Sequence, residues 1–485
     1  MTVPEEAVLD AVRYLRRVRP IDPAEIVQYV EAERTPTDVA DVIRAHAFEL
    51  GLREREDGTF VPVSTEPIHP EPVAVETIPE RYLAVLRDRL CERYGETWAS
   101  GETGDRVRDV IRACKAAYLA GDPVTYDEET TLGYALYHFP SSYATMQYVL
   151  SDLDVVGLSS HQLRILEIGA GVGGSTVGLI DRLGPDCLLS YHVIEPSEPA
   201  AEMLGELVAR THRNVHVAID ATPIESATFG DAYDLIVCSK VLNELDDPES
   251  VVSRLAERLT PDGSLLAIEP ADERTSRGLR RIERVAVADT PFEVYSPTIR
   301  LWPNREPTTV DWSFVEREPL AVPDVQRRLD EAPRGRSDDR DPATGEFVNA
   351  SVRYSYSILR TDGTRRVTFR PDSRRWTPLA EAADLIGERV DVAAVKLSGS
   401  IADDGNPVYV IGDGSQTVEH FAVNTARTDW NHHLRTASYG DVLLVEDGLA
   451  LWNDDEAAVN LVIDDESIVH VITPGGSYHA DEPRA

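Results

Sequence analysis

The stretch LRILEIGAGVGGS, residues 163–175, constrains the fold of this chain more than any other part of the sequence. Its first half is short and apolar on both faces, as expected for a strand buried in a parallel sheet. Gly169, Gly171 and Gly173 follow at once, and glycines let the backbone turn sharply and bring N–H groups close to a ligand. Ser175 is a good N-cap for the helical segment that comes next. The stretch therefore predicts a strand, a cofactor-binding loop and a helix.

Further apolar runs repeat this arrangement downstream. The run LLSYHVIEPS contains Glu195 at its end, VHVAID closes on Asp220, and YDLIVCS leads to Lys240 and a helix-like segment. A last run, GSLLAIEP, follows a predicted turn at residues 261–263. Strands that alternate with helices predict an α/β fold with a doubly wound, mostly parallel sheet. An acid at the end of the second strand suits a ribose, because one carboxylate can accept hydrogen bonds from both hydroxyls.

The order of these motifs resembles class I S-adenosylmethionine-dependent methyltransferases, which have a Rossmann-like core. A dinucleotide dehydrogenase is the competing interpretation of a glycine loop followed by an acid. Two features favour the methyltransferase: Glu167 lies two residues before the first glycine, and LTPDGSLLAIEP is typical of that class. The resemblance implies S-adenosylmethionine as cofactor, held by Glu167, Gly169, Ala170, Gly171, Gly173, Glu195, Asp220 and Ser239. Within this set the glycines and Glu167 would face methionine and ribose, Glu195 the ribose and Asp220 the adenine, although Asp220 is equally compatible with a simple turn.

The catalytic residues stay open at this stage. The loop after YDLIVCS lacks the [DNS]-P-P-[YFW] pattern of enzymes that methylate exocyclic base amines. Cys238 stands at a strand end where a thiolate nucleophile could lie, but a buried strand cysteine is the plainer interpretation. Lys240, Asn243 and Glu244 are the remaining candidates, as an incomplete lysine–acid relay. Cofactor binding is therefore better supported than any particular methyl acceptor.

Composition says little about function here. The chain has 85 acidic and 48 basic residues and a net charge of −37, and its only lysines are Lys115, Lys240 and Lys396. This pattern resembles proteins of a salt-rich cytoplasm, as in haloarchaea, where strong screening keeps acidity from excluding a polyanionic partner. The four cysteines are widely spaced, so no metal site is predicted. Without an apolar run of membrane-spanning length or a signal-peptide core, the expectation is a soluble, cytoplasmic protein without a membrane partner.

The flanking regions predict further domains. Residues 1–63 contain three amphipathic segments, at 5–17, 23–33 and 38–50, and a hairpin that turns at Asp57-Gly58, which together resemble a winged helix. Its third segment is rich in acids, so protein or RNP docking is favoured over DNA binding. Five further regions complete the division. They are a linker at 64–79, a helical region at 80–160, the methyltransferase-fold domain at 161–372, a five-stranded OB-like β-barrel at 376–474 and an acidic tail at 475–485.

A second resemblance is more specific. The passages HFPSSYATMQYVLSDL, SKVLNEL and RYSYSILR look like the methyltransferase-like assembly factors of the small ribosomal subunit, over residues 80–359. The plainer interpretation of the first passage is that Tyr143, Met146 and Tyr148 pack against the sheet. Many members of that family bind an iron–sulfur cluster through cysteines and a histidine, yet the matching stretch VYSPTIRLWPNREP contains neither. We therefore predict that this chain holds no iron–sulfur cluster.

Aromatic and basic residues suggest an RNA partner. Tyr409, Phe421 and Trp452 of the predicted barrel are candidates for base stacking, although core packing is the commoner role. Two arginine-rich stretches stand out in so acidic a chain and predict an RNA-binding groove. The residues assigned to it are Arg274, Arg277, Arg281, Arg365, Arg366, Arg370, Arg374 and Arg375.

These observations lead to one leading hypothesis and two alternatives. The leading hypothesis is a methyltransferase-like protein that acts on or with small-subunit ribosomal RNA. The first alternative is a non-catalytic ribosome assembly factor that retains a cofactor pocket. The second is a small-molecule methyltransferase.

Overall fold

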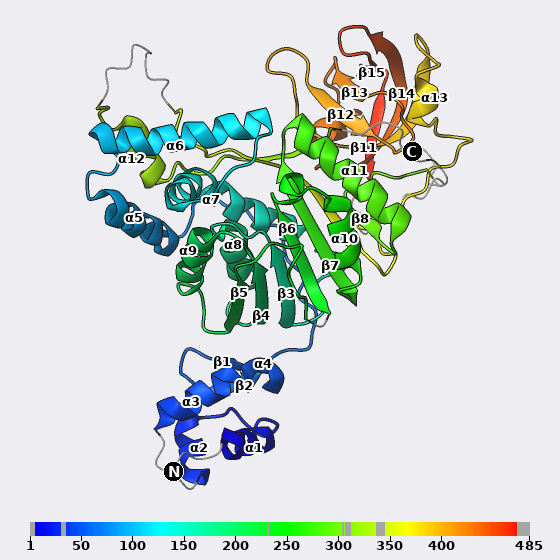
Figure 1. Cartoon of the computed structure of the whole chain (residues 1–485). Coiled ribbons are helices and arrows are strands. Elements are labelled where there is room, and N and C mark those ends of the chain that lie inside the picture. The colour runs from blue at the N-terminus through cyan, green and yellow to red at the C-terminus, as the bar shows by residue number, and fades with distance from the viewer. Residues whose placement is uncertain are drawn as a thin grey trace. The chain divides into compact units, whose positions relative to one another are not determined.

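The computed structural model describes residues 5–30, 35–230, 232–302, 305, 312–335 and 345–472 (Figure 1). The chain divides into two compact units. The first contains Met1–Ile236 and Leu320–Ala350, and the second contains Val237–Pro319 and Ser351–Ala485.

The first unit begins with a small module around a core that includes Val12, Ile26 and Ile43. Its elements are α1 (Glu5–Leu15), α2 (Pro23–Tyr29), α3 (Pro36–Ala45), α4 (Ala47–Leu50), β1 (Leu52–Glu54) and β2 (Phe60–Pro62). The three helical segments and the hairpin at Asp57-Gly58 form as predicted, but the third segment breaks at His46. His46 leaves the helical conformation, with φ −110° and ψ 10°. The winged-helix assignment of this module stays a prediction.

A helical region follows, with α5 (Glu80–Tyr94), α6 (Gly101–Ala120) and α7 (Glu128–Ser151), and α12 (Asp324–Glu331) belongs to the same unit. Helix α7 packs tightly on α8 (Gly174–Leu183), because a Cβ at Gly178 would lie 2.6 Å from the backbone oxygen of Tyr143. Tyr143, Met146 and Tyr148 are all buried. The tyrosine hydroxyls bond to Asp181 and to the backbone N–H of Val75. These side chains are therefore packed in the interior, with α7 against α8, while their contact with the sheet stays a prediction.

Three parallel strands of the first unit carry the glycine loop. They are β3 (Gln162–Ile168), β4 (Leu188–Ile194) and β5 (Val215–Asp220), and α9 (Glu198–Val208) follows β4. Ile168 pairs with Ile194, which in turn pairs with Asp220, so the three strands end in register. This register sets the loops after β3 and β4 at the same edge of the sheet.

The second unit contributes antiparallel strands. Its elements in this part are η1 (Leu242–Glu244), α10 (Pro248–Ala256), β7 (Leu259–Pro270), α11 (Glu273–Asp289), β8 (Glu293–Ser296), β9 (Val315–Arg317) and β10 (Val352–Arg360). Strand β10 runs antiparallel to β7, β8 and β9. Within this unit the strand order is β7-β10-β8, with β9 on β10, and within the first unit it is β5-β4-β3. The division between the units falls inside β6 (Tyr233–Ser239). The α/β prediction is confirmed, whereas the predicted turn at residues 261–263 is wrong. Those residues lie within β7, which begins at Leu259. Strand β10 pairs with β7 only from Ser264 onward, so Pro261 interrupts no ladder bond to β10.

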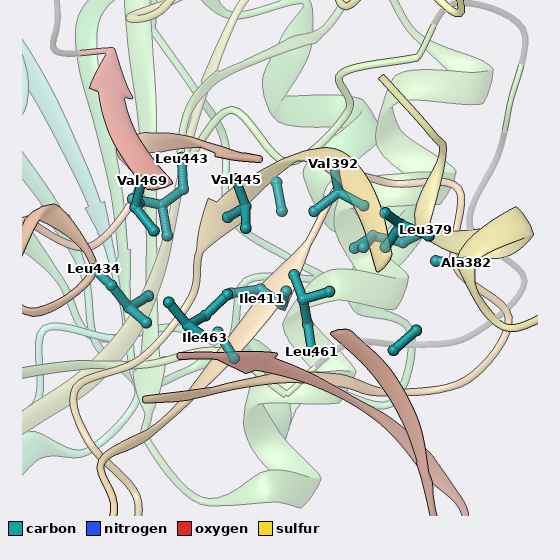
Figure 2. Close-up of a cluster of buried hydrophobic side chains, with 14 of the residues drawn as sticks. Leu379, Ala382, Val392, Ile411, Leu434, Leu443, Val445, Leu461, Ile463 and Val469 are labelled. Atoms are coloured by element: carbon teal, nitrogen blue, oxygen red, sulfur yellow. The ribbon is translucent and has the colours of Figure 1, made fainter. Parts of the chain in front are cut away.

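The last part of the second unit is a closed barrel. It contains α13 (Leu379–Ala382), β11 (Arg389–Lys396), β12 (Val408–Gly412), β13 (His420–Asn424), α14 (His433–Thr436), β14 (Val442–Asn453), β15 (Ala458–Ile463) and β16 (Ile468–Ile472). Five strands close in the order β11-β12-β13-β15-β14, with β14 returning to β11 and with β13 and β15 parallel. Figure 2 shows aliphatic side chains from these strands meeting in the interior, among them Ile411, Leu443 and Leu461.

The barrel confirms the predicted five strands and adds one. Residues 458–472 form two strands, β15 and β16, rather than one, because Asp464 and Ser467 make a polar turn between them. Tyr409 and Phe421 are core residues, so their stacking role is wrong, while Trp452 is 43% exposed. Within the described ranges, no helix is both long and apolar enough to cross a bilayer.

Candidate functional site

The glycine loop after β3 is built from left-handed backbone. Gly169, Gly171 and Gly173 have φ values of +64°, +54° and +83°, a region that side chains rarely tolerate. Gly169 donates its N–H to the carbonyl of Ile194, which joins the loop to the end of β4. Gly173 is the N-cap of helix α8, so the prediction of Ser175 as N-cap is wrong, and Ser175 lies in the first turn. The N–H groups of these glycines are bonded within the protein, and the loop leads directly into the N-terminus of helix α8, where a nucleotide-like ligand can bind.

Glu195 holds this loop in position. The residue directly follows β4, and its side chain is 6% exposed. One carboxylate oxygen accepts the N–H of Gly171 at 2.7 Å and the other accepts the N–H of Ser197 at 2.9 Å. Burial raises the pKa of Glu195, and these two hydrogen bonds oppose that rise. Carboxylate oxygens have further lone pairs, so Glu195 can accept hydroxyl groups in addition.

Glu167 has a different role from the predicted one. Its carboxylate is completely buried. One oxygen accepts the hydroxyl of Ser175 at 2.5 Å, and the other accepts those of Thr176 and Tyr191 at 2.7 Å each. Both oxygens are therefore occupied by side chains of α8 and β4. We conclude that Glu167 is a positioning residue for the loop and the first turn of α8, rather than a group that faces a ligand.

Asp220 lies at the end of β5, and its side chain is 49% exposed. Its carboxylate is 2.9 Å from Nε2 of His192, whose Nδ1 lies 2.9 Å from the hydroxyl of Tyr233. The backbone oxygen of Asp220 accepts the N–H of Glu195. Asp220 is thus joined to Glu195 through the backbone, while its predicted contact with adenine stays a prediction. Ala170 is buried within the glycine loop.

The spacing around Gly173 allows a first prediction. A Cβ added there would lie 2.3 Å from Cδ1 of Leu204, whereas nothing lies within 4 Å of a Cβ added at Gly171. Both positions have positive φ, which alone costs about 1–2 kcal/mol for an L-residue. We expect Gly173→Ala to reduce the free energy of unfolding clearly more than Gly171→Ala, as measured by chemical denaturation. Equal losses would contradict the close contact with Leu204.

A second cluster lies after β6, in the second unit. Lys240 has a φ of +60°, unusual for a residue with a side chain, and donates its N–H to the carbonyl of Ile268 at 2.7 Å. Burial lowers the pKa of its ammonium group to about 8. Glu269, at the end of β7, is buried, and burial raises the pKa of its carboxyl group to about 8. The Coulomb attraction between the two charges opposes both shifts, which places an amine and a carboxyl group in titration range together.

Glu269 also orders the loop that carries the other candidates. One of its oxygens accepts the N–H of Leu242 at 3.0 Å, and the N–H of Asn243 interacts with the same carboxylate. Leu242, Asn243 and Glu244 form the turn η1. Ser239 is the last residue of β6, and Cys238 before it is completely buried, which supports the interpretation of a packed strand cysteine.

The sequence prediction missed Glu269. Glu269 lies in GSLLAIEP, a motif that indicated the fold but no site residue. The signal that could have identified it is the one that identified Glu195, an acid at the end of a strand. Nothing in the sequence indicates that the carboxyl group of Glu269 is buried beside Lys240. That information comes from the structure alone.

The predicted RNA-binding arginines are largely paired with acids. Arg277 bonds to Glu273 and Glu419, Arg281 to Glu249, Arg365 to Glu293 and Arg375 to Glu446. Arg274 and Arg366 have interactions as well, and Arg370 and Arg374 are exposed. The RNA-binding groove stays a prediction. In the described part of the chain, no group of three metal-ligating side chains gathers, and the stretch compared with the iron–sulfur motif lies partly outside the described residues.

Comparison with known proteins identifies the domain around the glycine loop. The family model described as a methyltransferase domain matches residues 166–265. The chain contains a methyltransferase domain. Models of a domain of unknown function, DUF8157, match on either side, its N-terminal domain at residues 5–56 and its C-terminal domain at 380–472. None of these three matches is to a ribosomal assembly factor, so that resemblance stays a prediction.

Relatives and solved structures add context. A highly reducing polyketide synthase, rstn3 of Aspergillus nomiae, is 30% identical over 136 residues, which are 27% of this chain and 5% of that protein. The hybrid PKS-NRPS synthetase poxE of Penicillium oxalicum is 31% identical over 183 residues, 36% of this chain and 4% of the relative. The chain thus spans about one twentieth of these curated relatives. The solved structure of the CurJ carbon methyltransferase is 13% identical in sequence and has a TM-score of 0.31. The match covers 74% of this chain and 90% of the CurJ chain.

Proposed function

We propose that this chain transfers a methyl group from S-adenosylmethionine to a small organic molecule. The observation that carries the proposal is the match of residues 166–265 to a methyltransferase domain, at a glycine loop whose backbone is fixed by the carboxylate of Glu195. The relatives that share this domain are named as polyketide and hybrid polyketide–peptide synthases, which make small molecules. Their names support a small-molecule acceptor here.

The residues of the loop fit such a cofactor. The space around Gly171 is open within 4 Å of an added Cβ, and its positive φ excludes most side chains. Glu195 has free acceptor capacity for the ribose hydroxyls. When bound, S-adenosylmethionine supplies a sulfonium methyl group, which a nucleophilic atom of the acceptor attacks.

Lys240 is the proposed proton acceptor. Its amine has a pKa of about 8, so a substantial fraction is neutral near that pH and able to take a proton from the attacking atom. Glu269 is positioned to balance the charge that Lys240 then carries. In this step the acceptor loses a proton to the Lys240 amine and gains the methyl group. The left-handed backbone of Lys240 is consistent with a residue kept for chemistry rather than for stability.

The ribosomal RNA hypotheses have weaker support. Four of the arginines assigned to RNA already pair with carboxylates, so binding a phosphate would require those pairs to open. The barrel retains Trp452 as an exposed aromatic residue, but Tyr409 and Phe421 are buried. The barrel therefore offers fewer exposed aromatic side chains for stacking on RNA bases than the sequence indicated.

One experiment separates these classes of acceptor. The full-length protein is incubated with methyl-labelled S-adenosylmethionine and with either total RNA or the small-molecule fraction of a lysate of the source cells. We expect label in the small-molecule fraction. Label in RNA alone would replace this proposal by the RNA methyltransferase, and cofactor binding without label in either fraction would support the non-catalytic alternative.

Glu195 provides the matched test of the cofactor site. Glu195→Ala removes the acceptor of the Gly171 N–H and the proposed ribose ligand. We expect S-adenosylhomocysteine to bind at least about 10-fold more weakly, because a hydrogen bond to a charged group contributes about 1.5–3 kcal/mol. Isothermal titration measures this loss. Glu198→Ala, an exposed residue in the first turn of α9, is the control and should bind like the wild type.

A further inference from the structure

A cavity in the second unit, away from the glycine loop and from Lys240, has an unusual charge. It has a volume of about 330 Å³ and is lined by four arginines, Arg300, Arg305, Arg365 and Arg370, and by a single glutamate, Glu293. The chain as a whole carries 85 acidic residues against 48 basic ones. A cavity with an excess of positive charge is therefore the opposite of what the composition favours.

The arginines of this cavity differ in their partners. Arg365 donates to Glu293 at 2.7 Å and to the backbone oxygen of Arg300 at 3.3 Å, which fixes its side chain. Arg305 bonds to Glu381. Within the described ranges, no acid is paired with Arg300 or Arg370, in contrast to Arg305 and Arg365. Two guanidinium groups without a carboxylate in a cavity are suited to an anionic ligand.

Apart from Thr298, the remaining lining is apolar, and part of it is held by hydrogen bonds. Val287, Val294, Ile299, Leu301 and Trp302 complete the wall. The indole N–H of Trp302 donates to the buried Asp413 at 2.7 Å, and the backbone N–H of Leu301 donates to the carbonyl of the same residue. The wall is thus anchored to the end of β12. A rigid apolar surface beside cations favours a ligand with an anionic end and an apolar body.

We propose that this cavity binds an organic phosphate monoester, with the phosphate on Arg300 and Arg370 and the organic group on the apolar wall around Trp302. A phosphate has several acceptor oxygens, which match the donor fork of a guanidinium better than one carboxylate does. The volume lies at the lower end of the range for small-molecule sites, so the ligand is a small one. This site is separate from the proposed methyl transfer and does not depend on it.

Phenyl phosphate and inorganic phosphate are the probes for this cavity. Titrated into the full-length protein at fixed ionic strength, phenyl phosphate should bind at one site and more tightly than inorganic phosphate, because only the former covers the apolar wall. Arg370→Gln, at an exposed position, and the double variant Arg300→Gln with Arg370→Gln should weaken phenyl phosphate about 10-fold or more. Failure of phenyl phosphate to bind the wild type, or equal affinity for the two probes, would overturn the proposal.

Arg281→Gln is the matched control. Arg281 is 64% exposed, pairs with Glu249 and does not line the cavity, so its replacement should leave phenyl phosphate binding unchanged. Equal weakening by Arg281→Gln would indicate unspecific attraction of anions and contradict the site. A short single-stranded RNA that binds tightly, loses affinity in both Arg281→Gln and Arg370→Gln, and displaces phenyl phosphate would instead indicate an extended RNA surface. Arg370→Gln keeps the test valid if the double variant does not fold.

Discussion

Replacement of Lys240 with methionine should lower the rate of methyl transfer about 10²- to 10⁴-fold, the usual contribution of a general base. The binding of S-adenosylhomocysteine should stay close to that of the wild type, because the proposed cofactor contacts lie elsewhere. Methionine keeps the apolar stem and removes the amine whose pKa burial lowers to about 8. Steady-state kinetics with the acceptor that the labelling experiment identifies measure the rate of methyl transfer. Titration with S-adenosylhomocysteine measures binding separately.

The pH dependence gives an independent readout of the same residue. The amine must be neutral to accept a proton, so the wild-type kcat/KM should rise about tenfold per pH unit below pH 8 and level off above it. Lys396→Met is the matched control, since burial lowers the pKa of this barrel lysine to about 8 as well. The control should retain the rise with pH, and Lys240→Met should lose it. Full activity of Lys240→Met, or an unchanged pH profile, would remove Lys240 from the mechanism.

Glu167→Ala should cost the protein about 3–5 kcal/mol of unfolding free energy. The substitution leaves the buried hydroxyls of Ser175, Thr176 and Tyr191 without their acceptor, and each buried donor without a partner costs about 1–3 kcal/mol. Because these groups fix the first turn of α8, cofactor binding should weaken as well. Chemical denaturation followed by circular dichroism measures the loss of stability.

Glu202→Ala provides the comparison for this variant. Glu202 is an exposed acid on α9, 3.9 Å from Arg89, and its loss should change stability by no more than about 0.5 kcal/mol. Glu167→Gln is a second test of the same hydrogen bonds. Its amide NH₂ group cannot accept the hydroxyl hydrogens that the carboxylate accepts. A Glu167→Ala protein as stable as Glu202→Ala would show that the buried carboxylate is not a structural anchor.

The sequence was sufficient for the parts of the fold that depend on local pattern. The apolar runs and the glycines predicted β3, the loop and α8, because each choice is made within a few residues. It also predicted five barrel strands, but merged β15 with β16, since a turn of Asp464 and Ser467 inside an acidic stretch has no glycine or proline to mark it. The antiparallel pairing of β10 with β7 was not predicted, because it joins residues far apart in the chain.

The site shows the same division. Glu195 was predicted at a strand end, and its contact with the glycine loop agrees with that placement. Glu167 was assigned to the ligand because it precedes the glycines, but sequence does not reveal that three hydroxyls occupy its carboxylate. Burial also decides the chemistry of Lys240 and Glu269, and burial of a single side chain is a property of tertiary packing.

The closure of the barrel has a consequence for the order in which the chain folds. Val392 of β11 pairs with Val445 of β14, and Phe421 of β13 pairs in parallel with Asn460 of β15. Pairings between residues so distant along the chain form slowly, because a long loop must be ordered before any contact compensates for the lost entropy. During synthesis, β11, β12 and β13 therefore emerge with open edges and wait for β14 and β15. Until β14 and β15 are available, the unpaired edges of β11 and β13 could pair with a strand of another chain.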